Sequence, residues 1–178
     1  MRKSLINRVI EAGIQHDMPE YLKRRLVPAN IISLVMLFGI AIPFVFITIV
    51  YFPSLVIYPV LGAVVTSISI IINHYGGLKY SRFIISFAPI LLGAIYNAYL
   101  SGPEDDPLPS LYLIELSFAL IPYVVFDLKE KGFLILCTIF CACVIITFPM
   151  TKFWFDSPYD STVLRSGWLS TLALSLAI

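Results

Sequence analysis

Long apolar runs separated by short polar links dominate the chain. A helix needs about 20 predominantly apolar residues to cross the hydrocarbon core of a membrane. Five runs approach or exceed that length, and a sixth is still apolar at the last residue. The pattern predicts an all-α fold, a polytopic transmembrane helical bundle with six spans. The predicted spans are Asn30–Phe52, Ser54–Asn73, Phe83–Ser101, Leu108–Phe126, Phe133–Met150 and Ser166–Ile178.

The last predicted span is truncated. Its run of about 13 residues is too short to cross a bilayer, and no charged residue follows it. We therefore expect the natural chain to continue into the cytoplasm, the alternative being a short final helix that ends inside the membrane. This reading divides the sequence into a basic N-terminal segment, residues 1–29, and a transmembrane bundle, residues 30–178.

The N-terminal segment predicts a short amphipathic helix over residues 1–15. Its apolar side chains share one face, which would suit either the membrane surface or a cytoplasmic partner domain. They are Leu5, Ile6, Val9, Ile10 and Ile14. Because the segment is basic and lacks a cleavable apolar run, we expect no signal peptide.

Basic residues indicate the orientation, because Lys and Arg are retained on the cytoplasmic side of a membrane. Of the 12 Lys and Arg residues, only Lys152 and Arg165 lie in links predicted to be external. The link at 102–107 is acidic and rich in turn residues, as an external loop permits. The pattern predicts a multi-pass membrane protein with a cytoplasmic N-terminus.

Glu115 is the one carboxylate well inside a predicted span. An intramembrane ionisable residue is costly and suggests function by default. Asn97 should lie at a similar depth on the preceding span, with Tyr96 and Tyr112 near it in sequence. These four residues form the candidate ligand-binding site. Three readings stay open: a polar pocket for a ligand or a proton, an interhelical hydrogen bond that only fixes packing, and a Glu115 side chain that reaches the external interface.

Composition narrows the class of protein. The chain is 59% hydrophobic and 13% charged, against about 25% charged residues in a soluble domain. A net charge of +1 argues against a nucleic-acid partner. The three cysteines, Cys137, Cys141 and Cys143, share one apolar run and read as structural thiols rather than a metal or redox site. No phosphate loop, zinc-ligand spacing or nucleophile motif appears, so we expect no cofactor, no metal site and no catalytic residue.

Several short segments carry a resemblance: Ala41-Ile42-Pro43-Phe44, Tyr51-Phe52-Pro53, Asn73-His74-Tyr75-Gly76-Gly77, Ser81-Arg82-Phe83 and Ile121–Lys131. They resemble the six-helix N-terminal membrane modules of some bacterial signalling proteins. In those proteins the module precedes a sensor histidine kinase or a class III nucleotide cyclase. The resemblance covers residues 20–178 and implies a receptor-like anchor whose last helix continues into a cytoplasmic effector. It also implies a homodimer, because such effectors work in pairs.

The leading functional hypothesis is thus a membrane sensor or anchor module with its effector beyond residue 178. Its partners would be the lipid bilayer, a second copy of the chain and a small extracytoplasmic or lipophilic ligand. The alternative is a small transporter or channel, which would need several polar groups converging at mid-membrane. Whether the full protein is an enzyme is left open, since an effector motif is missing from this sequence.

Overall fold

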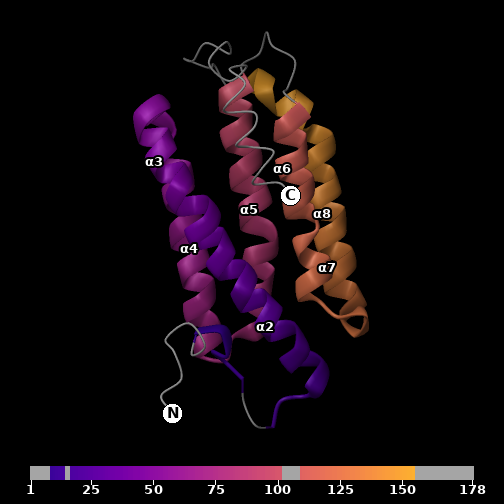
Figure 1. Cartoon of the computed structure of the whole chain (residues 1–178). Helices are drawn as coiled ribbons and strands as arrows, with labels where there is room; N and C mark the ends of the chain where they lie inside the picture. The colour runs from indigo at the N-terminus through magenta and orange to yellow at the C-terminus, as the bar shows by residue number, and fades with distance from the viewer. Residues whose placement is uncertain (1–8, 15–16, 102–108, 155–178) are drawn as a thin grey trace.

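The computed structural model describes residues 9–14, 17–101 and 109–154, and this part of the chain is helical and free of strands (Figure 1). Some α-helices continue directly into a π-helical or 3₁₀ segment without an intervening loop. The elements are α2 (Glu20–Leu34), the π-helix η1 (Val35–Ala41), α3 (Ile42–Tyr51), the 3₁₀ turn η2 (Pro53–Leu55), α4 (Ile57–His74), α5 (Leu78–Ser101), α6 (Pro109–Ala119), α7 (Ile121–Val125), the 3₁₀ turn η3 (Leu128–Glu130), α8 (Lys131–Thr151) and the 3₁₀ turn η4 (Lys152–Trp154).

Four of these helices are long and apolar enough to cross a membrane. They are Glu20–Tyr51, Pro53–His74, Leu78–Leu100 and Leu128–Met150. Large apolar side chains on their outer surfaces are exposed, among them Phe46 at 66% and Ile146 at 74%. Such surfaces suit lipid rather than water. The all-α fold is therefore confirmed, and four of the predicted spans correspond to helices long and apolar enough to cross a membrane.

The remaining two predicted spans have different outcomes. The run Leu108–Phe126 is interrupted at Leu120, where α6 ends and α7 begins. Pro122 causes the break, because it has no N–H to donate to the carbonyl of Phe118 and its ring crowds that carbonyl. The apolar helix there, Tyr112–Val125, is shorter than the four spans. The predicted sixth span, Ser166–Ile178, lies outside the described residues.

The first span contains a wide turn. Residues Val35–Ala41 are π-helical and lead directly into Pro43 at the start of α3. A proline inside a helix leaves the carbonyl four residues earlier, here that of Gly39, without its usual donor. The wider π turn accommodates the proline without ending the helix, and such π-bulges occur frequently at functional sites. As a result α2, η1 and α3 form one rod.

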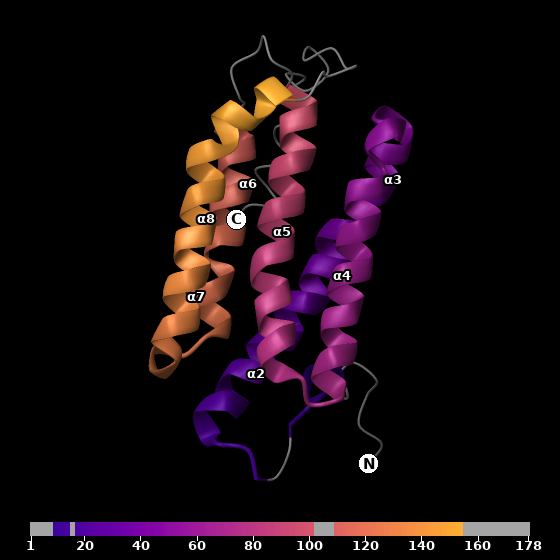
Figure 2. The same ribbon diagram turned by 180° about the vertical axis from the view of Figure 1, so that it is seen from behind.

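Helix α5 is the centre of the bundle. It packs against α4 on one side and against α6 and α8 on the other, as Figure 2 shows. The main core lies between α2, α5, α7 and α8 and contains Ile85, Ile90, Val125 and Phe126. Cys137 and Cys141 are buried in this core, as expected for structural thiols, whereas Cys143 is exposed.

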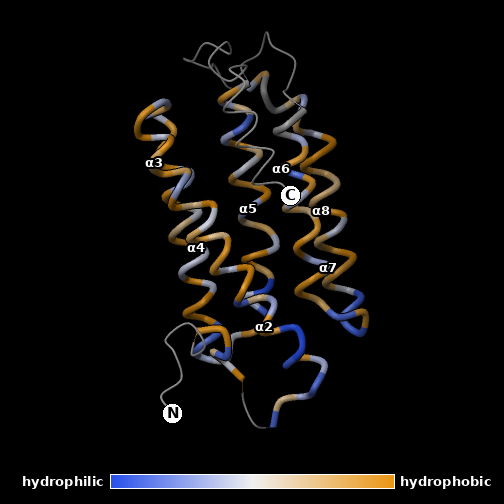
Figure 3. The backbone as a smooth tube through the Cα atoms, viewed as in Figure 1, coloured by the Kyte–Doolittle hydropathy of each residue, from blue (hydrophilic) through white to orange (hydrophobic). Residues whose placement is uncertain are grey.

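Charged groups gather at one end of the bundle, where α2 and α5 begin and where α7 meets α8 (Figure 3). Arg25 binds the Asp127 carboxylate at 3.4 Å and the Val124 carbonyl at 3.1 Å. Asp127 also accepts a hydrogen bond from the Lys129 backbone N–H at 3.0 Å. That backbone bond, and then Arg25, lower the pKa of Asp127. The link between α7 and α8 is thus fastened to α2.

The described part of the N-terminal segment packs on this same end. Residues 9–10 are helical and a turn follows, while the remainder of the predicted helix, at 1–8 and 15, is not described. Asn30 donates to the carbonyls of Ile10 and Ala12, at 2.9 and 3.0 Å. Gly13 has a φ of +83°, and a Cβ there would lie 2.2 Å from the carbonyl oxygen of Asn73. Only glycine therefore allows the turn to approach α4 so closely, and residues 9–14 are docked on the chain's own bundle.

Candidate functional site

Asn97 and Glu115 are hydrogen-bonded across the interface between α5 and α6. The Asn97 Nδ2 donates to Glu115 Oε1 at 2.8 Å. Asn97 is 4% exposed and Glu115 is 0% exposed. At about 1.5 Å of rise per residue, Asn97 lies about 28 Å along α5 from Leu78. The pair therefore lies in the half of the bundle remote from the charged end.

Gly93 provides the space for this carboxyl group. A Cβ at Gly93 would lie 2.8 Å from Glu115 Oε1 and 3.1 Å from the ring of Phe118. Contacts shorter than 3.0 Å would force one of the groups to move. The small residue on α5 thus lets α6 approach with its carboxyl inward. Because Glu115 is buried, the reading in which its side chain reaches the external interface does not hold.

Part of the Glu115 carboxyl is unsatisfied. Its Oε2 is buried and has no hydrogen-bond partner among the described residues. In the same part of the chain, the ion pairs of Arg25, Arg82 and Lys23 go to other carboxylates. Buried polar groups without a partner are rare and call for an explanation, such as a function or a bound molecule.

The two tyrosines of the predicted site lie in different parts of the bundle. The Tyr96 hydroxyl is 3.0 Å from Thr48 Oγ1, and its ring meets Phe44 edge-on at 6.1 Å. These contacts join α5 to α3. Tyr112 instead packs its ring edge-on against Phe148 of α8, with centroids 5.2 Å apart. Tyr96 therefore belongs with Asn97 at the interior of the bundle, whereas Tyr112 belongs to a separate apolar cluster.

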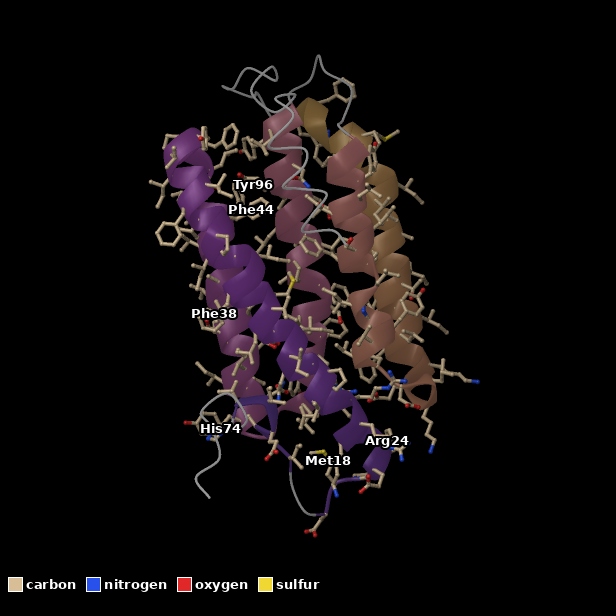
Figure 4. The ribbon with its side chains drawn as sticks, viewed as in Figure 1. Met18, Arg24, Phe38, Phe44, His74 and Tyr96 are labelled. Atoms are coloured by element: carbon tan, nitrogen blue, oxygen red, sulfur yellow. The ribbon has the colours of Figure 1, made fainter. Side chains whose placement is uncertain are left out.

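A cavity of about 100 Å³ lies beside Asn97 and is lined by η1, α3, α4, α5 and α6. Figure 4 shows two of its wall residues, Phe44 and Tyr96, between α3 and α5. The walls are mostly apolar, and representative residues are Phe44, Tyr58, Leu92, Tyr96, Asn97 and Phe118. Tyr112 and Glu115 are not among the wall residues.

Sequence reasoning missed this cavity, although its signals were in the chain. Pro59, Gly62, Pro89 and Gly93 all line it. Prolines and glycines inside spans alter helix direction or remove side-chain volume. Each is common in membrane helices, so only the three-dimensional arrangement shows that these four residues meet at one place.

A second polar cluster, at the charged end, was also missed. Asn73 Nδ2 donates to Asn30 Oδ1 at 2.7 Å, and both side chains are 0% exposed. Nearby, the hydroxyls of Ser69 and Ser81 are 2.7 Å apart. These contacts join α2, α4 and α5 and hold the N-terminal turn. The cluster has a structural role, since its hydrogen bonds connect segments of this chain.

No family model matches the chain, and comparisons with curated proteins and with solved structures return no match. Its function is therefore argued from its own residues.

Proposed function

We propose that the chain is the membrane sensor and anchor module of a bacterial signal-transduction protein. Its output domain would be a cytoplasmic histidine kinase or a class III nucleotide cyclase, as the resemblance of its sequence implies. The observation that carries this proposal is that two helical rods each line the cavity in the half remote from the charged end and carry a charged contact near their other end.

The first rod is α2–η1–α3. It contributes Phe44 to the cavity, and its other end carries Arg25, which binds Asp127 and the Val124 carbonyl. The second rod is α5, with Asn97 at the cavity and Arg82 bound to Glu130 near its start. A ligand that changes how the rods pack at the cavity would alter the contacts at the charged end. Small shifts of packed helices are an established form of switching.

The transporter alternative is less well supported. It requires polar groups along a path through the membrane. In the described part of the chain, the polar residues lining the cavity are Tyr58, Thr66, Tyr96, Asn97 and Ser117. Thr66 and Ser117 each donate to a carbonyl of their own helix. The cavity is thus an apolar site with one free polar group, which suits binding better than ion passage.

The test is the output of the product of the complete reading frame. Gly62→Leu should change kinase or cyclase activity severalfold, because the new side chain occupies the cavity. The Cβ itself fits, since it would meet only Ala41 Cβ at 3.9 Å. Val64→Leu, on the exposed surface of the same helix, is the control and should leave output unchanged. A reading frame without an effector domain, or equal output from both variants, would contradict the proposal.

The orientation of the module is part of the proposal. With the charged end in the cytoplasm, the protein lies in the bacterial inner membrane with a cytoplasmic N-terminus. In a cysteine-free background, a cysteine at Ser101 should react with an impermeant maleimide added to intact cells. A cysteine at Lys79, in the exposed turn at the charged end, should react only after the cells are opened. Labelling of Lys79→Cys in intact cells would reverse the assignment.

A homodimer is likewise proposed, through the outer face of α8. Small side chains let membrane helices approach closely. On α8, Ala142 and Cys143 are exposed, whereas Cys141 is buried in the bundle and cannot contribute to a contact between copies.

A further inference from the structure

The polar groups around the cavity are almost all engaged. The Tyr96 hydroxyl contacts Thr48, the Thr66 hydroxyl donates to the Gly62 carbonyl at 2.8 Å, and the Ser117 hydroxyl donates to the Leu113 carbonyl at 2.8 Å. The remaining walls are aliphatic and aromatic. An occupant must therefore be largely apolar.

Asn97 is the exception. Its amide nitrogen is held by Glu115 Oε1, so its Oδ1 is turned away from that carboxyl. Among the described residues, no group donates to Asn97 Oδ1, although Asn97 is 4% exposed and lines the cavity. The fully buried unsatisfied oxygens among the described residues are Asn73 Oδ1 and Glu115 Oε2, so Asn97 Oδ1 keeps some accessible surface, and a donor supplied by a ligand would satisfy it. The cavity thus offers one hydrogen-bond acceptor in an apolar enclosure.

Access to the cavity is from the side. Phe44, Tyr58 and Leu92 line it yet keep part of their surface exposed. The neighbouring surface of α4 presents exposed apolar residues, including Leu61 at 40% and Val64 at 47%. Around a membrane-spanning bundle, such a surface faces acyl chains. A molecule already dissolved in the bilayer can therefore reach the cavity without crossing water.

We infer that the cavity binds the hydroxyl end of a lipophilic molecule of the long-chain alcohol class, with the hydroxyl donating to Asn97 Oδ1 and the rest of the chain extending through the open side into the bilayer, because a cavity of about 100 Å³ is too small for the whole chain. This inference names the ligand class for the proposed sensor and rests on that function only for its biological meaning. Glu115 acts as a positioning residue, because its carboxyl holds the Asn97 amide in the orientation that presents Oδ1.

The experiment uses a diazirine-bearing long-chain alcohol as the probe, with the protein in lipid nanodiscs. After irradiation, mass spectrometry should locate labelled residues on the cavity wall, such as Phe44 and Leu92. Labelling mainly on outer residues such as Phe46 and Ile146 would mean bilayer contact only and would overturn the inference. Because the readout is labelling, its failure is distinguishable from failure of the signalling proposal.

Competition tests the polar contact. Dodecanol should displace the probe roughly fivefold better than dodecyl methyl ether, which has no donor to offer. In the double variant Asn97→Leu/Glu115→Leu, which leaves no unpaired partner, the two competitors should become equivalent while labelling continues. Equal competition in the unmodified protein would refute the role of Asn97.

Two Gly→Leu variants test whether the probe binds in the cavity. Gly62→Leu should lose most of the labelling on the cavity wall. Gly132→Leu should keep it, since a Cβ at Gly132 meets nothing within 4 Å and that residue is remote from the cavity in sequence and fold. Retained labelling in Gly62→Leu would show that the probe binds elsewhere.

Discussion

Arg82→Ala is expected to lower the free energy of unfolding by about 3–5 kcal/mol, because it leaves the Glu130 carboxylate largely buried without its cation. Arg82 is 1% exposed, and its guanidinium makes two short bonds to Glu130, at 2.6 and 2.8 Å. It also donates to the carbonyls of Val125 and Leu78, and it lies over the Phe126 ring at 5.1 Å. Its loss would remove the contacts that hold the start of α5 against the junction of α7 and α8.

The measurement is reversible unfolding in detergent or nanodiscs, followed by helix content. Lys79→Ala, at an exposed position in the same helical turn, is the matched control and should change the free energy of unfolding by less than about 0.5 kcal/mol. The double variant Arg82→Met/Glu130→Met should be more stable than Arg82→Ala, because it leaves no unpaired charge. A loss for Arg82→Ala no greater than for Lys79→Ala would show that the ion pair adds nothing to stability.

The spans were predictable because hydropathy is a local property. Runs of apolar residues suffice to place α4, α5 and α8 to within a few residues. The start of the first helix could not be predicted in this way, because α2 begins at Glu20 while the apolar run begins at Asn30. The first turns of α2 carry Lys23, Arg24 and Arg25, which are helical yet polar. Hydropathy reports the part of a helix that can enter lipid, not the length of the helix.

The candidate site was predictable only in part. Depth along adjacent spans is a one-dimensional quantity, so the Asn97–Glu115 contact could be expected from counting residues. The rotation of each helix about its axis is set by packing, and this placed Tyr96 toward α3 and Tyr112 toward α8. The cavity and the Asn30–Asn73 contact depend on helices far apart in sequence, so no local pattern shows that these residues meet.

The second large effect on the free energy of unfolding is expected for Asn97→Leu. It should exceed the effect of Glu115→Leu, although both substitutions break the same hydrogen bond. Asn97→Leu removes the hydrogen-bond donor to Glu115 Oε1, and the other oxygen, Oε2, is already unsatisfied among the described residues. A buried polar group left unpaired costs about 1–3 kcal/mol, and more when it is ionised. We therefore expect Asn97→Leu to lower the free energy of unfolding by about 3 kcal/mol.

Glu115→Leu should cost only about 1 kcal/mol, the scale of an interhelical hydrogen bond in a membrane, because it removes the unsatisfied oxygen together with the bond. Glu115→Gln keeps an oxygen that accepts from Asn97 and should be nearly neutral. The double variant Asn97→Leu/Glu115→Leu should be more stable than Asn97→Leu alone, because both polar groups are gone. Unfolding free energies of the four variants, with signalling output measured on the same samples, separate the two readings that remain. Altered output from the stable Gln variant indicates a ligand site, whereas unaltered output leaves the pair as a packing contact only.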